Sequence, residues 1–223
     1  MVSLVAATFV ATVATGCVLV GAGYDDDPPV TTTTPTNAER PRRAPTTSTT
    51  PTTLLRRAPV HEARTDYYEI TGRTLRELSR AMDRQGLVDP ADQKPGVAQT
   101  VWNISWTWGG APWRFDARSI QVNVTTTVKM PRWTPPPRAD PGVVATWSGF
   151  VDSLGKHERK HVAIAQGYAD AIPGFVESQS PRSYEEANDW AELKISQCSQ
   201  DQIALDVTTN HGETEGASRA GWL

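Results

Sequence analysis

The sequence predicts an α+β domain that follows an N-terminal segment lying outside the fold. Two observations favour this class. Two segments in the middle of the chain alternate between apolar and polar residues, as half-buried strands do, and the last third contains two long helix-forming stretches. The order strand, helix, two strands, two helices groups the elements instead of alternating them. We therefore predict three regions, namely 1–23, 24–65 and 66–223.

Residues 1–23 contain no charged residue and are rich in Val, Ala, Leu and Thr, which is typical of an export signal or a marginal membrane span. The sequence Ala-Thr-Gly-Cys at 14–17 resembles a bacterial lipobox, in which Cys17 is lipidated and begins the mature chain. The sequence is compatible with three alternatives, namely a lipoprotein, a cleaved signal peptide and a retained membrane anchor. Each of them exports the domain, either into the medium or onto the outer face of the cell envelope.

Residues 24–65 are dominated by Thr, Pro and Arg and offer almost nothing apolar to bury. Such a segment cannot offset the conformational entropy that ordering would cost, so we expect a disordered linker. It includes His61.

The folded region opens with a short strand and turn at 66–72. A capping box of Thr74 and Glu77 then starts a helix that Gly86 stops. Residues 100–108 and 120–130 are predicted as antiparallel strands because their apolar and polar side chains alternate. Large aromatic side chains on one face of the first strand could stack on sugars, but beside two helices we expect them to be core. They are Trp102, Trp106 and Trp108.

Two helices complete the domain. A long amphipathic helix is predicted over 142–172, ended by Pro173 and the glycine after it. A second is predicted over 183–205, where Ser183 and Glu186 form another capping box.

Composition limits the chemistry. The net charge of −3 argues against nucleic-acid binding as the main task. Two cysteines, Cys17 and Cys198, are too few for a disulfide-dense scaffold or a thiolate zinc cluster. Any metal must therefore be held by histidine and carboxylate side chains.

The long helix contains the sequence His-Glu-Arg-Lys-His at 157–161, which has the pattern H-E-x-x-H. At about 100° per residue, His157, Glu158 and His161 fall on the apolar face of the helix. Burying these groups unsatisfied costs on the order of several kcal/mol. One Zn²⁺ would satisfy both imidazoles, which lie one helical turn apart. The alternative is a charged, solvated helix face on which the histidines are incidental.

Glu158 would lie beside the open coordination position of such a site. There it could take a proton from a zinc-activated water and deliver it to the leaving amine. A catalytic zinc normally has a third protein ligand. His211, in a polar segment after the last helix, is the leading candidate and Asp206 the alternative. Further acidic options are Glu192, Glu213 and Glu215.

The chain also carries Tyr-Glu-Ile-Thr-Gly at 68–72, the tryptophan-rich strand at 102–106, the H-E-x-x-H sequence, and Asp-Val-Thr-Thr-Asn-His-Gly at 206–212. With these motifs, residues 67–217 resemble the bacterial domain of unknown function family 922, described as predicted secreted zinc-dependent proteases. The closing segment looks like that family's D-x-x-T-x-H-G. The resemblance implies a zincin-like fold, with both histidine ligands on one helix and a C-terminal His or Asp completing the site.

We therefore predict an exported zinc-dependent metallopeptidase with His157, His161 and His211 as metal ligands, Glu158 as the base and Cys17 as a lipidation site. The expected partner is a peptide or protein substrate, with no nucleic acid, and membrane attachment would run through the N-terminus. The alternative is a cell-envelope binding or adhesion module on a zincin-like scaffold without proteolytic activity. Glu158 separates the two, because a purely structural zinc site needs no base.

Overall fold

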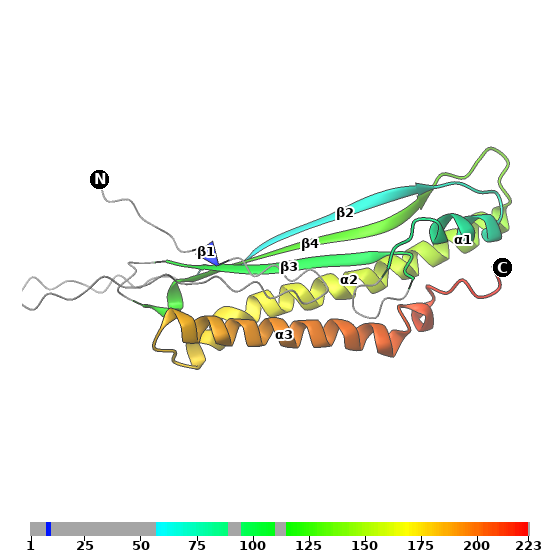
Figure 1. Cartoon of the computed structure of the whole chain (residues 1–223). Coiled ribbons are helices and arrows are strands. Elements are labelled where there is room, and N and C mark those ends of the chain that lie inside the picture. Colours follow the sequence, from blue (N-terminus) through cyan, green and yellow to red (C-terminus); the bar gives the residue numbers. More distant parts are fainter. Residues whose placement is uncertain (1–7, 10–56, 89–94, 110–114, 223) are drawn as a thin grey trace, which may run out of the picture.

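The computed structural model describes residues 8–9, 57–88, 95–109 and 115–222, so Cys17 and most of the predicted linker lie outside the described residues (Figure 1). The α+β class is confirmed. The strands are β1 (Thr8–Phe9), β2 (Val60–Ile70), β3 (Gln99–Trp108) and β4 (Ile120–Trp133). The helices are α1 (Leu75–Asp83), α2 (Pro141–Ser178) and α3 (Tyr184–Thr209), with short 3₁₀ helices η1 (Ala117–Ser119) and η2 (Glu213–Glu215).

The sheet has the strand order β1-β3-β4-β2. Strands β3 and β4 pair antiparallel from Gln99↔Lys129 to Trp108↔Ile120, as predicted, whereas β2 runs parallel to β4. The sheet is therefore mixed: the predicted antiparallel pairing is confirmed for β3 and β4 but does not extend to β2. Alternating side chains reveal which face of a strand is buried but not the direction of its neighbour.

Strand β2 begins inside the predicted linker. Its residues from Val60 to Tyr67 are exposed, and only Tyr68 and Ile70 are buried. The expectation of disorder over 60–65 is wrong because main-chain pairing with β4, which starts at Val60↔Asn123, holds this stretch without burying its side chains. His61 is part of this strand, and its Nε2 lies 2.9 Å from Asp170 Oδ1.

Helix α2 continues past Pro173 to Ser178, so the prediction that it ends at Ile172 is wrong. A proline inside a helix removes one hydrogen bond and costs about 3 kcal/mol. Burial offsets this cost here, because Ile172, Pro173 and Val176 are all buried in the interior.

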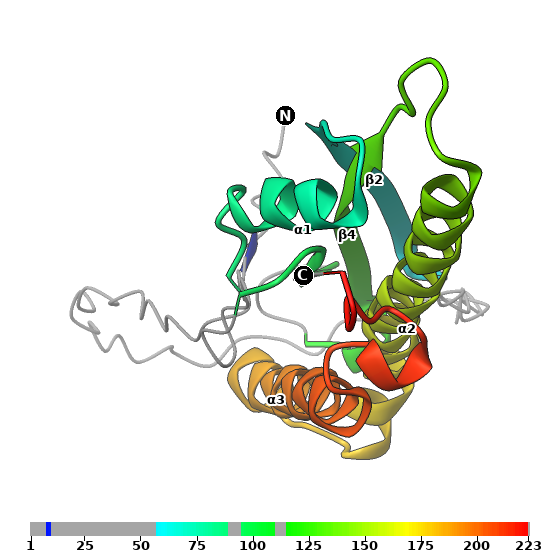
Figure 2. The ribbon, with the colours of Figure 1, turned by 90° about the vertical axis from the view of Figure 1, so that its right-hand side faces the viewer.

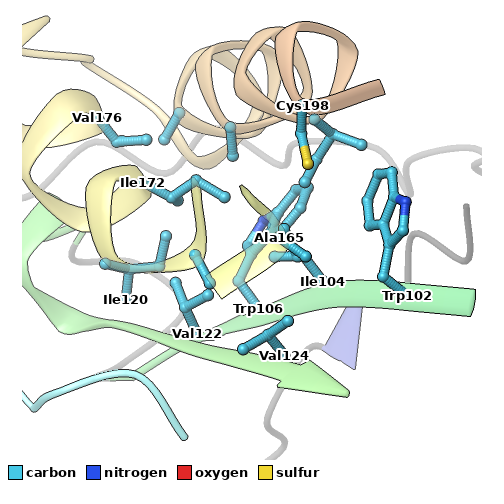
Figure 3. Packing of buried hydrophobic residues seen from close by; sticks show 14 of the residues in the cluster. Trp102, Ile104, Trp106, Ile120, Val122, Val124, Ala165, Ile172, Val176 and Cys198 are labelled. Carbon is cyan, nitrogen blue, oxygen red and sulfur yellow. The ribbon is translucent and has the colours of Figure 1, made fainter. Parts of the chain in front are cut away.

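A first apolar cluster fills the space between β3, β4 and the helices α2 and α3 (Figure 3). Trp102, Trp106 and Trp108 lie in it, which confirms that they are core. The indole nitrogens of Trp106 and Trp108 both donate to Asn188 Oδ1 of α3, at 2.8 and 2.9 Å. One amide oxygen thus satisfies two indole groups that the core would otherwise leave without an acceptor.

A second apolar cluster joins α1, the first half of α2 and the end of the chain. Trp222 packs there against Trp147 and Phe150. Figure 2 shows how the C-terminal segment returns from α3 across α2 toward α1. Along α2 the second cluster reaches Leu154 and the first begins at Ala165, so the H-E-x-x-H sequence occupies the stretch between them.

Within the described part of the chain, no helix combines the length and the apolar character that crossing a bilayer requires.

Replacing Asn188 by leucine tests the role of the shared acceptor. Asn188→Leu leaves two indole N–H groups of the core without a partner, so the free energy of unfolding should fall by about 2–4 kcal/mol in urea denaturation. Asn188→Asp, which keeps an acceptor oxygen, should lose much less. Equal stability of the leucine variant and the parent would contradict this account.

Candidate metal centre

Helix α2 presents the two histidines and the glutamate of the H-E-x-x-H sequence to the interior. His157, Glu158 and His161 are 2%, 5% and 8% exposed, whereas the intervening Arg159 and Lys160 are exposed. The inward orientation predicted from the helical period is confirmed, and the alternative of incidental histidines on a solvated face is wrong.

Three potential ligand atoms converge between α2 and α3. Asp206 Oδ1 lies 3.1 Å from His157 Nε2 and 3.0 Å from His161 Nε2, and the two nitrogens are 3.2 Å apart. These residues form a group that could hold a metal ion. The structure thus brings Asp206, the alternative third ligand, together with both histidines.

Asp206 reaches this position because α3 is longer than predicted. The helix ends at Thr209, not near Leu205, so Asp206 belongs to its last turn and follows Gln202 by one turn. Both side chains then point at the same histidine of α2. Gln202 had no signal in the sequence, because a glutamine inside a helix is usually a solvated residue.

The other ring nitrogen of each histidine has its own partner. His157 Nδ1 lies 3.2 Å from Glu215 Oε2, and His161 Nδ1 lies 2.5 Å from Gln202 Oε1. The Gln202 amide is oriented by its nitrogen, which donates to the main-chain oxygen of His161 at 3.0 Å. Both partners of the Nδ1 atoms are therefore acceptors, so each Nδ1 can carry the hydrogen while Nε2 faces Asp206.

This arrangement of protons leaves three electron-pair donors facing one another. In that tautomer the Nε2 lone pairs of His157 and His161 face the Asp206 carboxylate, as metal ligands require, whereas without a metal an Nε2 that carries the hydrogen donates to Asp206. A cation bound between these three atoms would remove the repulsion between their electron pairs. Atoms bound to one tetrahedral zinc at about 2.0–2.1 Å lie about 3.3 Å apart, close to the distances found here, and two imidazoles with one carboxylate are a known zinc donor set.

His211, the leading candidate from the sequence, does not belong to this group of three. Its Nδ1 lies 3.7 Å from Asp206 Oδ1, and its side chain is 30% exposed in the wall of the adjacent cleft. Glu215, one of the acidic options, contacts the outer nitrogen of His157 and not the group itself.

Glu158 lies in the same cleft, beside the group but outside it. Its Oε2 accepts a 2.6 Å hydrogen bond from Thr100 Oγ1 of β3. Burial raises the pKa of the Glu158 carboxyl, although the Thr100 hydrogen bond and both histidines oppose the shift. Thr100 was not identified from the sequence, because only the packing of β3 on α2 brings the two together.

The electrostatics of the group follow from its hydrogen bonds. Burial favours a raised pKa for Asp206, but the hydrogen bonds with His157 and His161 outweigh it and hold the pKa well below its usual range. For His161, burial acts to lower the pKa, while the hydrogen bond and charge of Asp206 raise it overall. The carboxylate is therefore ionised, as a metal ligand must be.

The cleft is bounded by the segment that leads into β3, by α3 and by the C-terminal segment. Residues 95–100 form one side, Gln202, Ile203 and Asp206 another, and Glu213, Ala217 and Arg219 the third. Arg219 is held in place by Asp83 and Ser79 of α1, at 2.6 and 2.9 Å. Open space therefore reaches Glu158 and the histidines from the surface.

A tight turn after α3 brings the chain onto His157. Asn210, His211 and Gly212 have φ values of 47°, 53° and 83°, three left-handed residues in succession. A Cβ at Gly212 would lie 2.9 Å from His157 Cγ. Only glycine allows the main chain to lie this close to the imidazole in this conformation.

Comparison with known families agrees with these motifs. The model of a family described as bacterial protein of unknown function (DUF922) matches residues 65–212. The chain belongs to this DUF922 family. No curated protein and no solved structure matches it. The matched stretch contains the H-E-x-x-H sequence, Asp206 and His211, and it ends at Gly212.

Gly212→Ala should disturb the candidate metal centre through His157. The added methyl group must displace the imidazole, so zinc affinity, measured by competition with a chelator, should fall about 10-fold or more. Gly221→Ala is the matched control, since Gly221 also has a φ of 83° but nothing within 4 Å of an added Cβ. Both variants carry the backbone strain of about 1–2 kcal/mol. Equal zinc affinities would rule out the contact as the cause.

Proposed function

We propose that this DUF922 protein is a zinc-dependent peptidase with a zincin-like active site. His157, His161 and Asp206 would hold the metal, and the observation that carries the proposal is the convergence of their three electron-pair donors beside a buried glutamate in an open cleft. Two imidazoles and a carboxylate packed at this distance are suited to a cation.

Zinc, when bound, supplies a Lewis acid that polarises a carbonyl group and lowers the pKa of water. The side chains of the protein carry out and orient the proton transfers. Glu158 takes the proton from the attacking water and passes it to the leaving amine. Thr100 fixes the Glu158 carboxylate by donating to Oε2, which leaves Oε1 for the water. The raised pKa that burial gives Glu158 matches a group that must both accept and release a proton.

The surroundings of this site support a peptide substrate. The cleft has residues 95–100, which lead into β3, on one side and exposed Ile203 on the other. A peptide presents amide groups and apolar side chains, which these two walls complement. From the uncharged, apolar sequence at 1–23 we propose that the protein is exported and that Cys17 tethers it to the envelope by a lipid.

The first test concerns the metal and its third ligand. The purified protein should contain about one Zn²⁺ per chain, and His161→Ala and Asp206→Ala should each lose it, because each removes one of three donors. His211→Ala should keep zinc within a few-fold of the parent affinity. Zinc content is read by elemental analysis and affinity by competition with a chelator. Loss of zinc in His211→Ala with retention in Asp206→Ala would reverse the assignment of the third ligand.

The second test concerns catalysis. Glu158→Gln keeps the shape and the hydrogen bond from Thr100 but cannot accept the proton, so peptide hydrolysis should fall roughly 100-fold or more. Its zinc content should equal that of the parent. A mutant that cleaves as fast as the parent would refute the role of Glu158. A zinc-loaded parent that cleaves no member of a broad peptide library would favour a binding or adhesion module instead.

A further inference from the structure

We propose that Glu215 is a positioning residue for the metal centre, and that Lys160 holds Glu215 in place. Glu215 would set the protonated nitrogen and the orientation of the His157 ring, and thereby the strength with which His157 binds the metal. This inference rests on the proposed zinc site. It assigns a function to a residue beyond position 212, where the match to the family ends.

The contacts form a chain from the surface to the metal ligand. Lys160 Nζ donates to Glu215 Oε1, and the other oxygen, Oε2, accepts from His157 Nδ1 at 3.2 Å. Lys160 and His157 lie on the same helix, almost one turn apart. Glu215 therefore binds both from outside the helix and bridges a solvent-exposed ammonium group to a buried imidazole.

The turn that carries Glu215 packs against α2 both before and after Glu215. Gly212 lies against the His157 ring, and a Cβ at Gly216, whose φ is 98°, would lie 2.9 Å from Ser153 Oγ. The 3₁₀ helix η2 between these glycines therefore rests directly on α2. Main-chain packing therefore places Glu215 beside His157, and the contact with Lys160 orients its carboxylate.

The two histidines differ in the partner of Nδ1. His161 has the neutral amide of Gln202, whereas His157 has a carboxylate. A carboxylate that accepts the Nδ1 proton makes Nε2 of the same ring a stronger electron-pair donor than an amide does, and such partners change metal affinity by about 10–100-fold. We therefore expect the imidazole of His157 to be a stronger electron-pair donor to the metal than that of His161.

An exposed ion pair alone would not explain this arrangement. Lys160 is half exposed, and surface pairs of this kind contribute about 0–1 kcal/mol. The pair Lys156–Asp152, one turn earlier on the same helix, is such a surface pair, with an N–O distance of 2.6 Å. Glu215 differs from Asp152 in its contact with His157, and so the two carboxylates form a matched comparison.

The experiment measures the zinc affinity of the full chain by competition with a chelator. Glu215→Ala should weaken zinc binding about 10–100-fold, and Glu215→Gln, whose amide oxygen can still accept from Nδ1, should fall between it and the parent. Lys160→Met should weaken binding a few-fold, since Glu215 is then held less firmly. The control variants Asp152→Ala and Lys156→Met should bind zinc as the parent does.

A second readout separates positioning from a general loss of structure. The melting temperature of the metal-free protein should be the same in Lys160→Met and Lys156→Met, since both replace a half-exposed lysine. If Glu215→Ala does not fold without metal, the two lysine variants carry the test.

Zinc binding by Glu215→Ala within two-fold of that by Asp152→Ala would overturn the role of Glu215. So would equal affinities of the two lysine variants. A parent protein that binds no zinc at all would instead refute the proposed function, so the two failures are distinguishable.

Discussion

The burial of two imidazoles and a carboxylate on one face of α2 is the constraint on which the rest of the structure depends. His157, Glu158 and His161 lie between two apolar clusters, where unsatisfied polar groups are costly. Their partners come from three other parts of the chain: Thr100 of β3, Gln202 and Asp206 of α3, and Glu215 of the C-terminal turn. The hydrogen bonds of these three buried side chains therefore determine how α2 packs against α3, the sheet and the C-terminal segment.

The same contacts give the site its chemical character. Acceptors occupy both Nδ1 atoms, so the Nε2 atoms of His157 and His161, which lie beside Asp206, are available to hold the proposed cation. Glu158 is satisfied separately by Thr100, which keeps it out of the donor group and in the cleft. The proposed ligands His157 and His161 and the proposed base Glu158 are thus distinguished by their hydrogen-bond partners, although all three stand on one helix.

The C-terminal segment is as much part of the site as the helix is. Gly212 lies on the His157 ring, Glu215 contacts its nitrogen, Arg219 lines the cleft, and Trp222 anchors the segment in the second apolar cluster. Docking of this segment and the geometry of His157 are coupled, because neither can shift without the other. The family match ends at Gly212, so this coupling extends the site beyond the shared motifs.

The sequence by itself determined the α+β class, the central hairpin and the inward face of the H-E-x-x-H helix, since these depend on local periodicity, which neighbouring residues encode. It also placed Asp206 and His211 among the candidate ligands and favoured His211, whereas the structure groups Asp206 with the two histidines. That choice depended on where α3 ends and on how it packs against α2. Tertiary structure alone decided the parallel pairing of β2, the continuation of α2 through Pro173, and the contacts of Thr100, Gln202 and Glu215 with the H-E-x-x-H sequence. Each of these arises from contacts between segments far apart in the chain, and no local pattern of residues records such contacts.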